Sequence, residues 1–426
     1  MKLLVIGSGG REHALAWCLA KTPGLQKVFV APGNAGTAHE HGVQNIDLSD
    51  PLALADFAEN EKIDLTVVGP EAPLAAGVVN LFRSRGLKIF GPTKEAAQLE
   101  SSKDFAKRFM VRNKIPTAAF ETFSDAAAAH AYVDNQGAPI VIKADGLAAG
   151  KGVVVALSLD EAHRAIDNML SGNKPSAHHN EASARVVIEE FLEGEEASFI
   201  VMVDGRNVLA LASSQDHKRI GDGDSGPNTG GMGAYSPAPV VTPDIHAKTM
   251  REIIMPTVRG MAADGMPYTG FLYAGIMIGK DGSVKTVEFN CRMGDPETQP
   301  IMMRLKSDLF TLLEYAVTGK LDQIEAKWDR RVALGVVLAA ANYPDTPRLG
   351  DAINGIPLES KDTHVFHAGT AEKNGTVVTA GGRVLCVTSL GDNVKQAQKR
   401  AYDALLGIHF EGMQYRRDIG YRAIGR

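Results

Sequence analysis

The stretch KLLVIGSGGREHALAWCLAK, residues 2–21, decides the fold at the start of the chain. The apolar run 2–6 leads into a glycine-rich turn, and a segment of helical composition follows from residue 12 to residue 21. Further apolar runs, which we predict to be strands, follow at 27–31, 65–69 and 88–91. Because strands and helices alternate, residues 1–101 are predicted to form a parallel sheet with helices on both faces.

The rest of the chain changes character. Residues 102–192 are predicted to contain helices at 102–113 and 158–170 and strands at 140–143, 153–157 and 185–192. Residues 193–327 mix strands with long glycine-rich loops. Residues 328–426 hold strands at 332–339 and 384–387 and a helix at 393–406. The sequence therefore predicts a multidomain chain that combines α/β and α+β parts.

Composition narrows the functional class. The 426 residues include 45 Lys and Arg against 50 Asp and Glu, a net charge of −5, which offers no broad basic surface for nucleic acid or anionic membranes. The three cysteines lie far apart, so neither a disulfide framework nor a zinc site is indicated. No apolar run approaches the roughly 20 residues of a membrane helix, and the start lacks a signal-peptide cleavage site. We expect a cytoplasmic enzyme.

The first glycine cluster is GSGGREH, residues 7–13, directly after a strand. Gly9 and Gly10 would let the backbone turn sharply and aim N–H groups at an anion, and Arg11 suits a phosphate monoester. A dinucleotide fingerprint needs glycine where this chain has Glu12, which disfavours an NAD-dependent oxidoreductase. A tight turn that binds nothing remains the alternative. Asn34 and Glu71 also follow strands, at the sheet edge where ligands bind.

The second cluster, KADGLAAGKG at residues 143–152, lies between two predicted strands. It misses the nucleotide P-loop, because only three residues separate Gly146 from Gly150 and Gly152 stands where Ser or Thr would bind magnesium. We interpret it as a hairpin tip whose N–H groups cover phosphates, with Lys143 reaching them from the strand end. A plain hairpin is the alternative.

Two further motifs carry oxygen ligands. The segment IEEFL at 188–192 offers strand backbone groups to an adenine edge, and nearby carboxylates could take ribose hydroxyls. Glu288 and Asn290 share one face of a predicted strand, whereas Val287 and Phe289 point to the other. Two oxygen ligands on one face suit a magnesium ion that also binds phosphate oxygens.

These motifs resemble the ATP-grasp ligases and, more narrowly, the phosphoribosylamine–glycine ligase (glycinamide ribonucleotide synthetase) family of de novo purine synthesis. The matching phrases extend over nearly the whole chain, to about residue 387: VIGSGGREHA, APGNAG, VVGPEAPL, KADGLAAGKGVVVA, IEEFLEGEEAS, QDHKR, GPNTGGMGAYSP, EFNCRMGDPETQP and GGRVLCVT. The combination of QDHKR with PNTGGMGAYSP is the most specific part of the resemblance.

The resemblance implies four parts. They are a Rossmann-like N-terminal domain at 1–101 that binds phosphoribosylamine, an ATP-grasp segment at 102–192 with a mobile ATP lid at about 122–192, a central ATP-grasp domain at 193–327, and a small C-terminal domain at 328–426. Other ATP-grasp enzymes take a second acidic metal ligand from the preceding strand, but the matching stretch 272–278 carries no acid here.

The motifs and the resemblance together nominate site residues. Nucleotide binding is expected from Lys103, Lys143, Gly146, Gly150, Gly152, Glu189, Glu190, Leu192 and Glu196, the last as the ribose carboxylate. Substrate binding is expected from Gly9, Gly10, Arg11, Asn34, Glu71, Asp216, Lys218, Arg292, Asp295 and Glu297. The residues expected to be catalytic are Lys143, Asp216, Lys218 and Arg292. Glu288 and Asn290 are expected to hold Mg²⁺ or Mn²⁺.

The implied reaction joins glycine to 5-phospho-D-ribosylamine through a glycyl phosphate, with ATP as co-substrate. It forms N1-(5-phospho-D-ribosyl)glycinamide on the route to IMP. Another ATP-grasp carboxylate–amine ligase, or a biotin-carboxylase-like enzyme, would share residues 103–290. A non-catalytic nucleotide sensor is disfavoured because Lys143, Glu288 and Asn290 are all present. The expected partners are ATP, glycine and phosphoribosylamine, for a monomer whose transient contact with pathway neighbours is left open.

Overall fold

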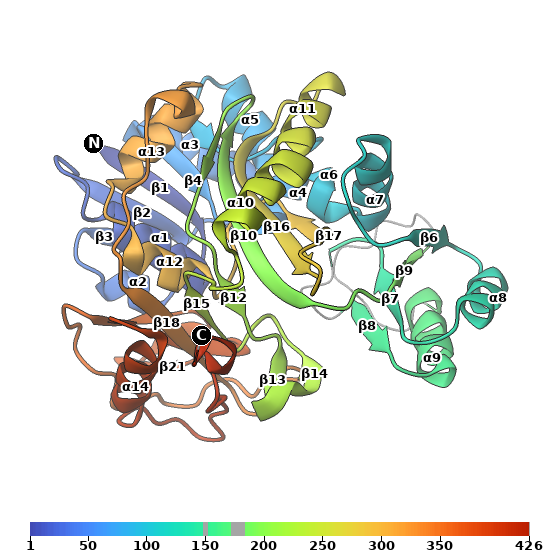
Figure 1. Cartoon of the computed structure of the whole chain (residues 1–426). Helices are drawn as coiled ribbons and strands as arrows, with labels where there is room; N and C mark the ends of the chain where they lie inside the picture. Colours follow the sequence, from blue (N-terminus) through green and yellow to red (C-terminus); the bar gives the residue numbers. More distant parts are fainter. Residues whose placement is uncertain (148–151, 172–183, 426) are drawn as a thin grey trace.

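The architecture comes from a computed structural model that describes residues 1–147, 152–171 and 184–425. Figure 1 shows a main body, from which a smaller unit with α8 and α9 projects to one side. The C-terminal part, which contains α14 (Val394–Leu405) and is drawn mainly in red, lies below the N-terminal sheet in this view.

The N-terminal sheet is parallel, with the strand order β3-β2-β1-β4-β5. Its strands are β1 (Lys2–Gly7), β2 (Lys27–Pro32), β3 (Val43–Asn45), β4 (Leu65–Val68) and β5 (Ile89–Phe90). Its helices are α1 (Gly10–Leu19), α2 (Ala35–His39), α3 (Pro51–Glu61), α4 (Glu71–Ala76) and α5 (Val78–Ser84). This is the doubly wound order, so the predicted parallel sheet is confirmed, and the turn after β1 lies at its ligand-binding edge.

The projecting unit has its own antiparallel sheet, in the order β6-β9-β7-β8. Its elements are β6 (Phe120–Phe123), α8 (Ala126–Gln136), β7 (Ile140–Ala144), β8 (Val153–Ala156), α9 (Leu159–Leu170) and β9 (Val186–Glu190). It is linked to the N-terminal part through α6 (Gln98–Ser101) and α7 (Lys103–Arg112). The predicted hairpin is present, because β7 pairs with β8 from Ile140 to Lys143. Its tip, residues 148–151, lies outside the described residues.

The central sheet is antiparallel, in the order β11-β10-β16-β17. Its strands are β10 (Glu195–Asp204), β11 (Val208–Ala210), β16 (Thr269–Ile278) and β17 (Val284–Asn290). A π-helical turn at Met250–Ile254 lies between α10 (Pro243–Thr249) and α11 (Met255–Ala263). After β17 the chain forms α12 (Thr298–Arg304) and α13 (Leu309–Val317).

The C-terminal sheet has the order β12-β15-β18-β22-β19. The strands β18 (Val332–Ala339), β19 (Thr363–His367) and β22 (Arg383–Gly391) come from the C-terminal part of the chain, with α14 (Val394–Leu405) beside them and the hairpin β20 (Thr370–Lys373)–β21 (Thr376–Thr379) near by. The strands β12 (Gln215–Asp216) and β15 (Gly233–Ser236) come from the middle of the chain. Between them lies the hairpin of β13 (Arg219–Gly221) and β14 (Ser225–Asn228). The glycine-rich stretch of the sequence therefore forms a hairpin between two paired strands of one sheet.

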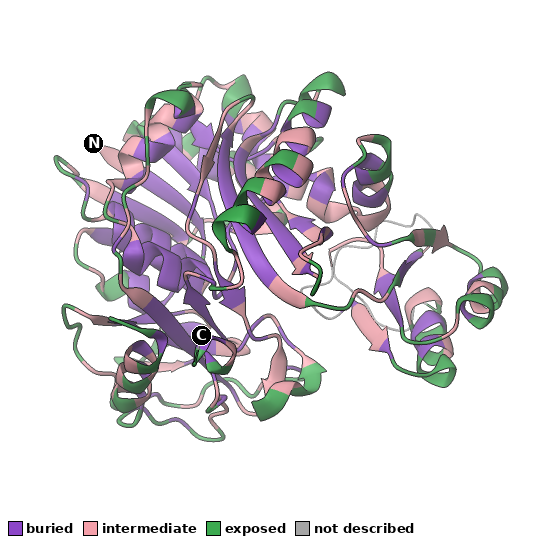
Figure 2. Ribbon diagram, in the orientation of Figure 1, coloured by how far each residue is buried: buried purple, intermediate pink, exposed green. Residues whose placement is uncertain are grey.

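Among the described residues, the main body holds three buried hydrophobic clusters and the projecting unit holds a fourth. One buried cluster runs from Leu4 in β1 to Phe289 in β17, so the N-terminal and central sheets share apolar packing. The projecting unit has a cluster of its own, which includes Ile142 and Ile188. Figure 2 shows the buried strands of the main body and the more exposed surface of the projecting unit.

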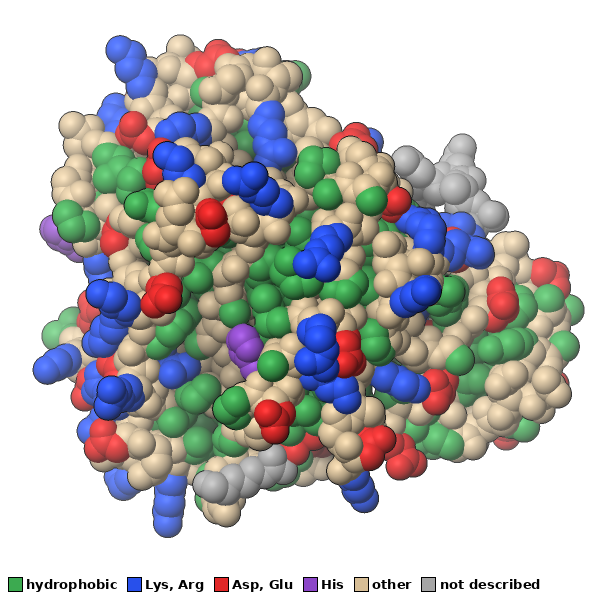
Figure 3. All heavy atoms as spheres, turned by 45° about the horizontal axis from the view of Figure 1, so that its top comes forward, with side chains coloured by type: hydrophobic (Ala, Val, Ile, Leu, Met, Phe, Trp, Pro, Cys, Tyr) green, Lys and Arg blue, Asp and Glu red, His purple; other side chains and the backbone are tan. Residues whose placement is uncertain are grey.

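The outer surface mixes charges of both signs. The face in Figure 3 carries Lys and Arg side chains beside Asp and Glu. Among the helices of the described residues, none has the length and apolar character needed to cross a membrane.

Candidate active site

The main pocket has a volume of about 720 Å³ and lies where the N-terminal, central and projecting parts meet. It brings together most of the side chains expected at the site. They are Arg11, Glu71, Lys103, Lys143, Gly146, Gly152, Glu189, Glu190, Leu192, Glu196, Asp216, Lys218, Glu288, Asn290, Arg292, Asp295 and Glu297. Residues far apart in the sequence thus converge on one cavity.

Glu288 and Asn290, near the end of β17, both line the pocket, while Phe289 is buried in the core. Among the described residues, Glu288 has no hydrogen-bond or ion-pair partner. Burial would raise the pKa of Glu288, but Lys218, Lys143 and Lys103 hold it below its usual value. An ionised carboxylate without a partner, beside an amide oxygen, fits the oxygen donors that Mg²⁺ or Mn²⁺ prefers.

Arg292 is held between two carboxylates. Its guanidinium contacts Glu100 at 2.8 Å and Glu71 at 3.2 Å. Burial alone would lower the pKa of Arg292, but Glu100 and Glu71 raise it well above its usual value. Glu100 also accepts the Cys291 N–H at 2.7 Å, and the Asn290 amide, oriented by its neighbours, donates to Glu100 at 3.0 Å. Glu100 therefore orients both the Arg292 guanidinium and the side chain of Asn290, which is a candidate metal ligand.

The expected nucleotide side is built around a buried carboxylate. Glu189 in β9 contacts Lys143 at 2.9 Å and Lys107 at 2.8 Å. Lys107 is 2% exposed, and burial lowers its pKa to about 8. Because its carboxylate forms ion pairs with two lysines, Glu189 can form hydrogen bonds with an adenine only through its backbone. Lys103 donates from Nζ to the Gly146 carbonyl at 2.8 Å, which ties α7 to the start of the hairpin tip.

The expected ribose carboxylate and the QDHKR motif meet in the pocket. Glu196 in β10 forms an ion pair with Lys218. Asp216 lies beside them, and its removal from water raises its pKa although Lys218 opposes the shift. Lys218 neutralises Glu196 in this structure, so a ribose hydroxyl would compete with this ion pair.

Asp295 and Glu297 also line the pocket. Arg383, from the C-terminal sheet, donates to the Asp295 carbonyl at 2.6 Å and contacts its carboxylate at 3.4 Å. Glu297 accepts from Ser198 at 2.9 Å and from the Tyr273 hydroxyl at 3.1 Å. Both carboxylates are held by the protein itself.

The N-terminal turn differs from the open cradle that we predicted. The Gly9 N–H donates to Glu12 at 2.6 Å, so it is not free for a phosphate. Glu12 also contacts Arg11 at 2.5 Å, and a Cβ at Gly69 would collide with its side chain. Arg11 is 7% exposed and lines the pocket, which excludes a solvent-facing role in this structure.

Four expected residues do not line the pocket or cannot be placed, and Gly9, whose N–H is bound to Glu12, is the first of them. Gly10 faces α12, where an added Cβ would lie 2.5 Å from Nε2 of Gln299. The Asn34 side chain caps the start of α2, because its Oδ1 accepts hydrogen bonds from the Gly36 and Thr37 N–H groups. Gly150 lies outside the described residues.

The sequence analysis missed three residues that build this site. Lys107 lies one helical turn after Lys103, and that spacing could have revealed it. Glu100 sits in a four-residue helix with no periodicity to mark it. Arg383 reaches the pocket from a strand that is 88 residues away from Asp295, which sequence spacing alone cannot show.

Comparison with known protein families agrees with this geometry over most of the chain. Residues 1–100, 101–298 and 333–422 match the N domain, the ATP-grasp (A) domain and the C domain of phosphoribosylglycinamide synthetase. The chain belongs to the phosphoribosylglycinamide synthetase family. The resemblance seen in the sequence is thereby confirmed, as is its multidomain fold with an ATP-grasp part.

Relatives in this family cover the whole chain. A phosphoribosylamine–glycine ligase of Ralstonia nicotianae is 67% identical over 426 residues, with both chains fully covered. One of Neisseria meningitidis serogroup A is 65% identical over 427 residues, again with full coverage of both.

Solved structures agree at the level of the fold. The crystal structure of the phosphoribosylamine–glycine ligase of Thermotoga maritima has a TM-score of 0.84 at 36% identity, and covers 99% of this chain and 100% of that one. Biotin carboxylase from Campylobacter jejuni has a TM-score of 0.74 at 14% identity, covering 97% and 92%, and shares the fold alone.

Proposed function

We propose that the chain joins the carboxylate of glycine to the amine of 5-phospho-D-ribosylamine and converts ATP to ADP and phosphate. The product is N1-(5-phospho-D-ribosyl)glycinamide, on the route to IMP. The observation that carries this proposal is the convergence of Lys103 and Lys143, the Glu288–Asn290 pair, and Asp216, Lys218 and Arg219 of the QDHKR motif on one pocket. Full-length relatives named for this activity support it.

The chemistry begins with activation of a carboxylate, which does not react with an amine while its leaving group is oxide. A glycine carboxylate oxygen attacks the γ-phosphorus of ATP, the bond to ADP breaks, and glycyl phosphate forms. The amine of phosphoribosylamine then attacks the carbonyl carbon. Phosphate leaves with the former carboxylate oxygen, and the amine loses a proton.

Positive charge and positioning are what the protein contributes to phosphoryl transfer. We assign Lys103 and Lys143 to the ATP phosphates, with Gly146, Gly150 and Gly152 covering them. Mg²⁺ or Mn²⁺ would be held by Glu288 and Asn290 and would supply further positive charge to the transferring oxygens. The unpartnered Glu288 carboxylate supports this assignment.

The remaining roles follow the walls of the pocket. Backbone groups of Glu189, Glu190 and Leu192 would form hydrogen bonds with adenine. Glu196 would give up its ion pair with Lys218 and accept hydrogen bonds from the ribose hydroxyls. Asp216, Lys218, Arg292, Asp295 and Glu297 are assigned to glycine and to the reacting amine. Arg11 and Glu71 are assigned to phosphoribosylamine. Gly9, Gly10 and Asn34 would shape the turn that positions Arg11, Asn34 through its hydrogen bond to Ser8 at 2.8 Å.

Several broader assignments accompany this function. We propose domain limits at 1–101, 102–192, 193–327 and 328–426, with residues from about 122 to 192 acting as an ATP lid. A closing lid would protect glycyl phosphate from water. We also propose a cytoplasmic monomer whose partners are its three substrates.

The direct test is ADP release with ATP, glycine and freshly prepared phosphoribosylamine, with each substrate omitted in turn. Release that needs all three, together with the mass of the glycinamide ribonucleotide, supports the proposal. Equal release with a different amine or carboxylate would instead identify another ATP-grasp ligase.

A further inference from the structure

Two histidines face each other on the projecting unit, away from the residues assigned to catalysis. His130 lies on α8 and His163 on α9, and their Nδ1 atoms are 2.7 Å apart. The ring centroids are 4.3 Å apart and the ring planes are inclined by 47°. Two basic nitrogen atoms from neighbouring helices thus point at the same position.

Each ring is anchored through its other nitrogen. His130 Nε2 contacts Asp167 at 2.8 Å, and His163 Nε2 contacts Asp134 at 2.7 Å. Carboxylates accept hydrogen bonds, so both contacts favour the tautomer with hydrogen on Nε2. With both rings neutral, the two Nδ1 lone pairs face each other at hydrogen-bond distance, so either one shared proton or a metal cation that replaces it must lie between them.

This arrangement is typical of metal-binding histidines, which donate their second ring N–H to a carboxylate. From it we propose that His130 and His163 bind a divalent transition-metal cation through Nδ1, with Asp167 and Asp134 orienting the two rings. The site is separate from the Glu288–Asn290 pair, which has only oxygen donors.

The separation of the nitrogens indicates which geometry the cation prefers. With metal–nitrogen distances of about 2.0–2.1 Å, adjacent ligands at a right angle lie about 2.9 Å apart, and tetrahedral ligands lie about 3.3 Å apart. The observed 2.7 Å is nearer to the right-angle value. The pair therefore fits a square-planar or octahedral cation such as Ni²⁺ or Cu²⁺.

Access and rigidity both suit this role. The side chains of His130 and His163 are 23% and 34% exposed, so water can fill the remaining coordination positions. The helices pack through buried residues that flank the pair, including Ala129 and Val133 on α8 and Ala162 on α9. This packing fixes the two rings before any cation arrives.

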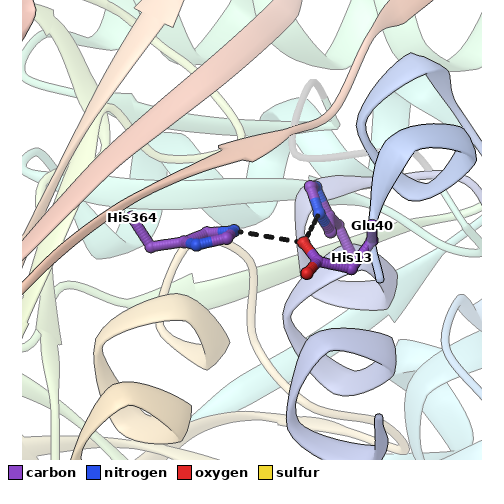
Figure 4. A group of neighbouring side chains, drawn as sticks. All are labelled: His13, Glu40 and His364. Carbon is purple, nitrogen blue, oxygen red and sulfur yellow. Dashed lines mark hydrogen bonds and ion pairs between the residues drawn. The ribbon is translucent and has the colours of Figure 1, made fainter. Parts of the chain in front are cut away.

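A second histidine cluster shows why proximity alone does not make a metal site. Figure 4 shows His13, Glu40 and His364 at the contact between the N-terminal and C-terminal parts. His13 Nδ1 accepts the His367 N–H at 2.8 Å, so its Nε2 must carry hydrogen and donate to Glu40 at 3.2 Å. The neutral His13 ring therefore has no lone pair left for a cation.

Calorimetric titration of the full chain, without a histidine tag, with Ni²⁺ tests the proposal. We expect one site in the wild type and its loss in both His130→Gln and His163→Gln. Asp167→Asn should weaken binding by about tenfold or more, because metal affinity depends on the orienting carboxylate. His41→Gln, at an exposed position in the N-terminal part, is the control and should bind as the wild type does.

Hydrogen exchange gives a second readout that does not depend on the variants. Ni²⁺ should slow amide exchange in α8 and α9 of the wild type, because the cation would join the two helices. Absence of this site in the wild type, or an unchanged site in the two histidine variants, would overturn the proposal.

Discussion

Two glutamates that line or border the same pocket have opposite surroundings. Glu12, in the turn after β1, is 1% exposed and is satisfied by the Gly9 N–H and the Arg11 guanidinium. Glu288, in β17, lies among lysines but has no hydrogen-bond or ion-pair partner among the described residues. The first carboxylate therefore stabilises its own turn, whereas the second is available to a ligand.

The largest effect is expected from removing the structural carboxylate. Glu12→Ala leaves Arg11 buried without its partner, and breaking a buried ion pair costs about 3–5 kcal/mol. Denaturant unfolding should show this loss, whereas Glu61→Ala, which removes a surface ion pair with Lys2, should change stability by about 1 kcal/mol or less. Equal losses in the two variants would show that Glu12 is not what holds the turn.

At Glu288 we expect a loss of activity without a loss of stability. Glu288→Gln keeps the shape of the side chain but removes its charge, so the fold should remain while kcat falls by about 10²–10³-fold, the usual effect of removing one charge-stabilising group. Steady-state kinetics at saturating magnesium, with circular dichroism to check folding, measure both. Near-normal turnover would reject Glu288 as the metal ligand.

A smaller effect is expected at the boundary between the two regions. In Gly10→Val the new side chain would displace Gln299, which donates to Asp295 at 3.0 Å. Overpacking of this kind costs about 1–3 kcal/mol. We expect a higher KM for phosphoribosylamine and an almost unchanged KM for ATP. If the KM for ATP rises instead, the turn belongs to the nucleotide side.

The smallest effect concerns the pH dependence of stability. The pKa of Lys107 is lowered by burial to about 8, against about 10.5 in an unfolded chain. Between these values the unfolded state binds more protons, so the contribution of Lys107 to stability rises with pH. The stability of the wild type relative to Lys107→Met should increase from pH 8 to pH 10, by on the order of 1 kcal/mol per unit at most. A difference that does not change with pH would contradict this.

The sequence could predict the elements and the residue types of the site, but not how they pair. Continuous apolar runs located four of the five strands of the N-terminal sheet, because the core needs apolar residues on both faces of a parallel sheet. The short strand β3, Val43–Asn45, was missed because it contains only one apolar residue. The Glu288–Asn290 spacing correctly placed both side chains in the pocket. In contrast, the turn at Gly9 looked open because the contact with Glu12 depends on backbone geometry. The part played by Arg383 needed the C-terminal sheet to be placed beside α12.

The central claim, that the glycine carboxylate is activated by phosphorylation, has a direct isotopic test. Glycine with ¹⁸O in both carboxylate oxygens is turned over with unlabelled ATP and phosphoribosylamine, and the released phosphate is analysed by mass spectrometry. Because the oxygen that attacks the γ-phosphorus departs with the phosphate, each phosphate should carry one ¹⁸O and the amide should retain the other. Unlabelled phosphate, with one ¹⁸O lost to water and the other kept in the amide, would contradict the account.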